Sequence, residues 1–268
     1  MLLSRGANPH VRMGGMHAFV SAYSGLSAAN LEMLQELAPH SVEIVGIPFL
    51  GCRILTNPFY GGRADAIEWI MAKFPESVRD EKTGWPMGIL TCCIMQHGEP
   101  DALSTALASG KFDVQYFAPK AGPLSFKVIR WVGGLNFRYG KNPSKLLEFG
   151  ALIAGTALHV AAFKGNFPAV DMLLKNGADV ASRAHQRKMT PLHVAAAMGH
   201  EDVCARLLKA GASATAHDNL KRTPAAWAKR RGHETLARVL VESEAPPGAK
   251  GKGGSYRKDR VAPRTKGL

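Results

Sequence analysis

Histidines are the side chains in this 268-residue chain that most readily suggest chemistry, and His159 and His193 stand in nearly identical surroundings. A neutral imidazole can act as a general base or as a metal ligand. Both histidines follow a threonine by three residues, and His200 and His233 each follow a glycine directly. No set of His, Cys, Asp and Glu shows the ligand spacing of a metal site. The regular surroundings therefore indicate structural histidines, and the sequence predicts no bound metal.

The adjacent pair Cys92 and Cys93 is the other candidate for chemistry, with His97, Glu99 and Asp101 shortly after it. A nucleophilic thiolate needs a neighbouring base or positive charge that lowers its pKa. The pair falls on an inward-facing apolar helix, where small side chains pack. The chain has four cysteines without a paired framework. We therefore expect buried structural thiols in a reducing compartment.

Glycine-rich segments complete the search for catalytic motifs. The run from Gly134 to Gly140 and Lys141 is one residue too long for a phosphate-binding loop, and Asn142 and Pro143 follow it. No nucleophile-elbow, zinc-protease or dinucleotide-binding pattern occurs in the right context. The sequence predicts neither an enzyme nor a cofactor.

The segments that carry the histidines are copies of one another. Their threonines lie 34 and then 33 residues apart, in Thr156–Asn166, Thr190–His200 and Thr223–His233. A period of about 33 residues that contains Thr-Pro-Leu-His-x-Ala is typical of ankyrin repeats. The chain resembles the ankyrin-repeat protein family. This resemblance implies an all-α solenoid of stacked helix-turn-helix units with short β-turn fingers, degenerate in its N-terminal half and followed by a disordered basic tail.

The resemblance also implies roles for the motif side chains, because threonine and histidine fix the turn before the first helix in this family. The structural residues are then Thr156, His159, Thr190, Pro191, His193, Thr223 and Pro224. Two glycines of the family's fingers are replaced by Lys188 and Lys221. Each replacement places a charge on a turn and weakens that turn slightly.

Four parts are expected along the chain. Residues 1–12 copy the end of a later repeat, which favours an array that continues upstream over an unusual half-repeat. Residues 13–151 are expected to hold degenerate repeats with insertions, and residues 152–242 three regular repeats. Residues 243–268, with eight Gly or Pro among the last 24 residues, are expected to be a disordered basic tail.

The degenerate part is still partly readable. Met16–Gly25 aligns with the first helix of a repeat, and a helix is predicted over Ala64–Phe74. A turn at Thr83 begins another unit, which closes at Gly110. A further unit with an inserted segment at 131–142 is expected within 115–151.

The net charge of +13 is concentrated in the C-terminal third. Residues 187–231 carry nine Lys or Arg against three acids, and residues 245–268 carry seven against one. Such local basic character indicates an acidic partner. The apolar stretches are too short to span a bilayer, and no signal peptide is evident. We expect an intracellular, cytoplasmic protein, with the nucleus as the alternative.

Proteins of this family bind partners with their finger tips and with two variable positions after the paired alanines. Those positions are Phe163, Lys164, Arg187, Met189, Ala197, Met198, Asn219, Leu220, Arg222, Arg230 and Arg231. The sequence thus predicts a non-catalytic scaffold or adaptor that binds a protein with an acidic surface or peptide. One alternative is the regulatory or targeting region of a larger enzyme or channel. Another is weak contact of the tail with nucleic acid or anionic lipid.

Overall fold

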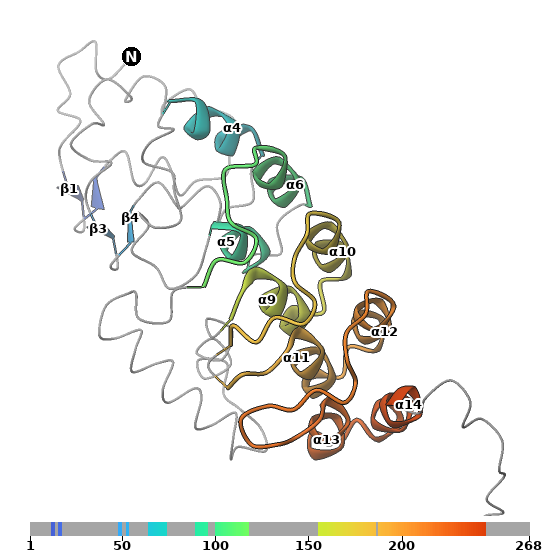
Figure 1. The fold of residues 1–268 in the computed structure, drawn as a ribbon. Coiled ribbons are helices and arrows are strands. Elements are labelled where there is room, and N and C mark those ends of the chain that lie inside the picture. The colour runs from blue at the N-terminus through green and yellow to red at the C-terminus, as the bar shows by residue number, and fades with distance from the viewer. Residues whose placement is uncertain are drawn as a thin grey trace, which may run out of the picture.

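A computed structural model of the chain describes residues 64–73, 89–95, 100–117, 155–185 and 187–244, and four two-residue strands nearer the N-terminus. The described helices form two parallel rows (Figure 1). The inner row contains α5, α9, α11 and α13, and the outer row contains α4, α6, α10, α12 and α14. Their bounds are α4 Ala64–Lys73, α5 Ile89–Met95, α6 Pro100–Ala108, α9 Ala157–Lys164, α10 Phe167–Lys175, α11 Pro191–Met198, α12 Glu201–Lys209, α13 Pro224–Arg230 and α14 Glu234–Glu244.

The first helix of each regular repeat begins and ends where its residue types require. Thr190 is the N-cap of α11 in extended conformation, and Pro191 takes the first helical position, where its missing N–H costs nothing. Gly199 ends the helix at φ +80°. A side chain there would also collide with His233, because a Cβ would lie 2.4 Å from Cε1 of that ring. His200 approaches Gly165 in the same way, so each of these glycines leaves room for the histidine of the next repeat.

Helices α9 and α11 are buried on nearly all sides, because each lies between two inner helices and against its own outer helix. Ala161, Ala162, Ala195 and Ala196 have no exposed surface. Alanine allows the helices of successive repeats to approach closely while it keeps a high helix propensity. The outer helices bury a single face, as in α12, where Val203, Cys204 and Leu207 face inward.

Two predicted units of the N-terminal half are confirmed as helices. Helix α4 covers the predicted Ala64–Phe74 almost completely and buries Ile67 and Met71. Helices α5 and α6 form the pair that was predicted to close at Gly110. This pair packs directly on the regular repeats, α5 against α9 and α6 against α10.

The further unit expected within residues 115–151 stays a prediction. The contact of the pair α5 and α6 with the regular repeats extends beyond the end of α6. The Gln115 amide confirms the proximity, because its Nε2 donates to the Gly177 carbonyl at 3.2 Å. Residues 118–154, including the predicted insertion, lie outside the described residues.

Two short hairpins complete the described N-terminal part. Strand β1 (Arg12–Met13) pairs antiparallel with β2 (Met16–His17), and β3 (Pro48–Phe49) pairs with β4 (Cys52–Arg53). Met16 and His17, expected at the start of a helix, are therefore in a strand. The truncated repeat at 1–12, apart from Arg12, and the tail after Glu244 lie outside the described residues.

Candidate partner-binding surface

The motif histidines join successive repeats. Nδ1 of His159 lies 2.8 Å from the Thr156 hydroxyl and accepts the Thr156 backbone N–H at 3.3 Å. The ring proton must then be on Nε2, which donates to the Met189 carbonyl of the next repeat at 2.9 Å. His193 repeats this arrangement, with Nε2 donating to the Arg222 carbonyl at 3.0 Å. These imidazoles join the start of one helix to the next finger, which is the kind of contact that a structural role requires.

Both imidazoles are neutral at physiological pH. Burial lowers the pKa of His159 to about 4, and burial likewise lowers the pKa of His193 to about 4. His200 makes a second link between repeats, since its Nε2 lies 3.0 Å from the Phe163 carbonyl of the preceding repeat. The ring nitrogens of His159 and His193 are not free for catalysis, because each has a hydrogen-bond partner in the fold.

The fingers are the turns that precede α11 and α13, here finger 1 (residues 183–189) and finger 2 (residues 217–222). In finger 2 the Asp218 carboxylate accepts the backbone N–H groups of Leu220 and Arg222 at 2.8 and 2.9 Å. In finger 1 His185 takes this role, because its Nδ1 accepts the Arg187 N–H at 3.1 Å. Side chains that hold the backbone two residues later are the usual means of fixing such turns.

A lysine in left-handed conformation closes each finger. Lys188 has φ +54° and Lys221 has φ +57°, the only non-glycine residues with positive φ within the described part of the chain. Their N–H groups donate to the His185 and Asp218 carbonyls at 2.8 and 3.2 Å. An L-residue in this conformation costs about 1–2 kcal/mol. Both lysine side chains are exposed, so each strained turn holds a positive charge in solvent at the same point of its finger.

The two fingers lie side by side and share backbone contacts. The Asn219 N–H donates to the Arg187 carbonyl at 3.0 Å, and Nη2 of Arg183 donates to the His217 carbonyl at 2.7 Å. The fingers therefore form one surface, on which Lys188 and Lys221 belong to neighbouring turns.

Finger 2 is further braced from the helix that follows it. Nε1 of the fully buried Trp227 donates to the second carboxylate oxygen of Asp218 at 2.9 Å. The Arg222 guanidinium lies over the Trp227 ring, 5.1 Å from its centre. Asp218, the single acid of the two fingers, is thus buried and bonded inward. The exposed charges of the fingers, Arg183, Lys188 and Lys221, are all positive.

The partner-binding residues predicted from the sequence divide by exposure. Asn219 and Arg230 are exposed, and Lys164, Met198, Leu220, Arg222 and Arg231 are partly exposed. Four others are buried, namely Phe163, Arg187, Met189 and Ala197. Met189 and Ala197 pack into the core, with 0% and 2% of their surface exposed, so their side chains cannot touch a partner. The prediction is corrected for these four positions.

The surface also includes residues that the predicted set did not contain. Arg183 and the two turn lysines contribute its exposed charges. The signal for the lysines was present in the sequence, since a charged residue stood at a glycine position of the motif. No sequence signal identified Arg183, because its position is defined by the contact with His217 in the next repeat.

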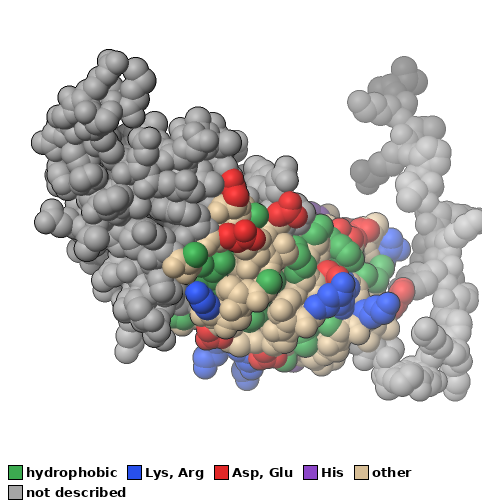
Figure 2. Space-filling model, turned by 90° about the horizontal axis from the view of Figure 1, so that it is seen from above, with side chains coloured by type: hydrophobic (Ala, Val, Ile, Leu, Met, Phe, Trp, Pro, Cys, Tyr) green, Lys and Arg blue, Asp and Glu red, His purple; other side chains and the backbone are tan. Residues whose placement is uncertain are grey.

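The outer helices present a different face. Charges of both signs lie there among apolar and uncharged groups (Figure 2). Asp171 pairs with Lys175 at 2.7 Å and with Arg206 at 2.8 Å. Hydrogen bonds from Lys175, and then from Arg206, lower the pKa of the Asp171 carboxyl. Charges on this face are balanced, in contrast to those of the fingers.

Two cysteines have side chains whose burial the structure describes, and both are buried. Cys93 and Cys204 are free cysteines inside the helix layers, and burial raises the pKa of the Cys204 thiol to about 12. No group of three or more His, Cys, Asp or Glu side chains suited to a metal ion occurs among the residues that the structure describes. Nor does any described helix have the length and apolar character needed to cross a membrane.

A family model of ankyrin repeats, in three copies, matches residues 158–250. Residues 158–250 are ankyrin repeats. The match covers α9 to α14, together with both fingers and the histidine links between repeats. No curated protein matches the chain. Ankyrin repeats are non-catalytic modules of protein–protein interaction, and the stacked helix pairs described above are the all-helical solenoid expected of them.

Proposed function

We propose that the chain is a non-catalytic scaffold whose two fingers bind an acidic segment of a partner protein. The contact would continue from Lys188 and Lys221 toward the inner helices, at Met198, Arg222 and Arg230. Exposed and partly exposed side chains there combine basic groups with the apolar surface of Met198 and Leu220. Such a mixture suits an acidic peptide that also carries apolar side chains.

One observation carries this proposal: two successive fingers hold a lysine in a left-handed turn where glycine would be free of strain. Strain that is confined to an exposed turn and repeated at one position suggests a role for the side chain. Neither lysine forms an ion pair with another described residue, so no such contact explains a lysine at these positions.

A protein partner fits this surface better than a nucleic acid does. Binding of single strands relies on exposed aromatic rings that stack on bases. In the two fingers and α13, the one aromatic side chain besides histidine is Trp227, and it is fully buried. The number of exposed charges is also small for attachment to phosphate.

The proposal can be tested by fluorescence anisotropy with the full-length chain. The probe is a labelled peptide of about 12 residues that alternates Glu with Leu, and its control carries Gln in place of Glu. We expect binding of the acidic peptide that weakens with salt. Replacing both Lys188 and Lys221 with Gln should weaken binding about two- to thirtyfold, since exposed ion pairs are worth roughly 0.2–1 kcal/mol each.

A matched control removes one charge from the outer row. Lys209 is exposed at the end of α12, and Lys209→Gln should leave the affinity unchanged. Equal binding of the Gln peptide, or equal loss with Lys209→Gln, would contradict recognition by the fingers. Tighter binding of an oligodeoxythymidine with the same number of charges would favour nucleic acid instead.

A further inference from the structure

The last repeat leaves an open end that differs from every interface within the regular array. His159 and His193 each bond to the finger of the next repeat, whereas Ala226 stands at their position in α13. Ala162 and Ala196 are fully buried by the next repeat, whereas their equivalent here is the exposed Lys229. An additional ankyrin repeat would find no histidine to hold its finger and would bury an ammonium group.

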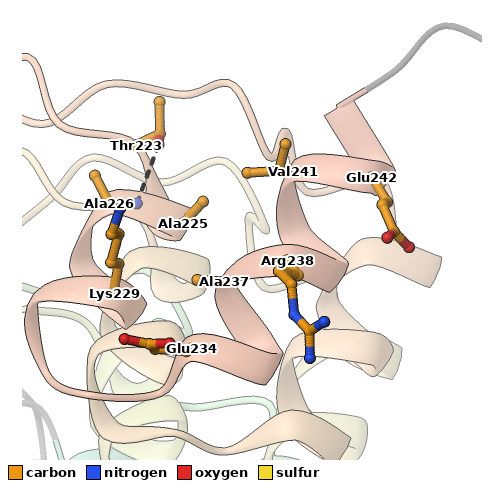
Figure 3. A pocket seen from close by; sticks show the side chains of 9 residues that line it. All are labelled: Thr223, Ala225, Ala226, Lys229, Glu234, Ala237, Arg238, Val241 and Glu242. Carbon is orange, nitrogen blue, oxygen red and sulfur yellow. Dashed lines mark hydrogen bonds between the residues drawn. The ribbon is translucent and has the colours of Figure 1, made fainter. Parts of the chain in front are cut away.

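An open hollow of about 770 Å³ lies on this end, between α13 and α14. Its floor is made of small side chains, chiefly Ala225 and Ala237, and Val241 stands on its rim (Figure 3). Val241 keeps 54% of its surface exposed. A hollow and an apolar projection therefore lie next to each other on one face.

The charges around the hollow are balanced. Lys229, Glu234, Arg238 and Glu242 line it, two of each sign. None of the four belongs to an ion pair with another described residue. The chain carries a net charge of +13, yet this face has no net charge. Two copies of such a face can pair their opposite charges, whereas a strongly charged partner would find no opposite net charge on it.

We propose that this end of the array binds the same end of a second copy of the chain, with the two α14 helices antiparallel across a two-fold axis. Val241 of each copy enters the hollow over Ala237 of the other, and Arg238 of each copy faces Glu242 of the other. Ala237 and Val241 are four residues apart, as are Arg238 and Glu242, so both pairs lie on one face of α14. In a two-fold interface each such contact occurs twice.

The dimer is expected to be weak. Helices α13 and α14 have only 7 and 11 residues, whereas a standard interface buries roughly 800 Å² per partner. We expect a dissociation constant in the micromolar range, about 1–100 µM. The lining of the hollow includes no residue of finger 1 or finger 2, so the substitutions that test the dimer leave both fingers unchanged.

The test is sedimentation equilibrium of the full-length chain over about 1–200 µM. Wild-type protein should form a dimer, and Val241→Asp or Arg238→Glu should weaken the dimer by about tenfold or more, through a buried charge or a repulsive pair. The double variant with Arg238→Glu and Glu242→Arg should restore association to within about threefold of wild type, because each pair regains opposite signs.

Val239→Asp is the matched control, because Val239 is exposed on α14 but does not line the hollow. It should leave association unchanged, and circular dichroism of each variant checks that its helices are intact. A chain that stays monomeric over the whole range would overturn the proposal. So would equal effects at Val239 and Val241, or a double variant that fails to dimerise.

Discussion

Replacing Lys188 and Lys221 with glycine should make the array more stable and its binding weaker. Substitutions that remove a binding side chain are ordinarily neutral or destabilising. Here the two effects have opposite signs, because the lysines occupy a backbone conformation that suits glycine, at φ +54° and +57°.

The size of the stability gain follows from two opposing terms. Relief of the left-handed conformation is worth about 1–2 kcal/mol per residue. Glycine also gives the unfolded chain more freedom, which removes about 0.4–1 kcal/mol of that gain. A net increase of about 0–1.6 kcal/mol is expected at each position, with a middle value of about 0.8 kcal/mol, and about 1.6 kcal/mol is the middle value for the double variant. For a domain near 100 residues, 1 kcal/mol moves the melting temperature by about 4–8 °C.

The assay is urea unfolding of the full-length chain, followed by circular dichroism, together with peptide titration by anisotropy. Lys209→Gly serves as the control, because Lys209 is helical and exposed, and glycine there should lower stability by up to about 1 kcal/mol. Asparagine at positions 188 and 221 tolerates the left-handed region and removes the same charges. It should weaken binding as glycine does.

Two results would refute the reasoning. A loss of stability with glycine at positions 188 and 221 would mean that these turns are not strained. A gain of stability with unchanged affinity for the acidic peptide would mean that the lysine charges take no part in binding.

Three other features of the repeats lend themselves to direct tests. The pKa values of His159 and His193 are lowered to about 4 in the fold, so these rings are protonated in the unfolded chain first as the pH falls below about 6.5. The free energy of unfolding should therefore fall by about 2 kcal/mol per histidine at pH 5, which a lower urea midpoint would show. An unchanged midpoint would contradict neutral buried rings. Gly199→Ala should cost at least about 2 kcal/mol in urea unfolding, from its φ of +80° and the overlap with His233, and a near-neutral effect would contradict the close approach. Cys204, with a thiol pKa raised to about 12, should resist iodoacetamide at pH 8 until urea unfolds the array, as mass spectrometry would show.

The repeated motif allowed the regular part of the fold to be predicted. Thr190, Pro191 and Gly199 encode a helix start and end locally, so their roles could be read from residue type and spacing. The period then fixed which helices are neighbours, and so the partners of His159 and His193. The strained turns could also be located, because a lysine stands at a glycine position of the motif in each finger.

Other features depend on contacts between distant segments. That α6 packs directly on α10 could not be inferred, because the two helices are far apart in the sequence and no local pattern marks the contact. Met189 was assigned to the surface by its position in the motif, yet its side chain is in the core. The role of His185 was also missed, because histidine replaces the aspartate that holds the equivalent turn at Asp218.

The open end combines a local feature with a long-range one. Lys229 stands where the other repeats have alanine, and a polar residue there suits a terminal repeat. Trp227, two residues earlier, is fully buried, because its indole N–H has the Asp218 carboxylate as partner below finger 2. The hollow between α13 and α14 depends on the packing of two helices and has no signature in the sequence.

Backbone amide chemical shifts test the role of the fingers most directly. The full-length chain, labelled with nitrogen-15, would be titrated with the Glu-Leu peptide. If the fingers bind the peptide, the largest shifts should belong to Arg183, Lys188, Asn219 and Lys221, with little change along α10 and α12. Shifts that are largest on the outer helices, with the two fingers unchanged, would contradict recognition by the fingers.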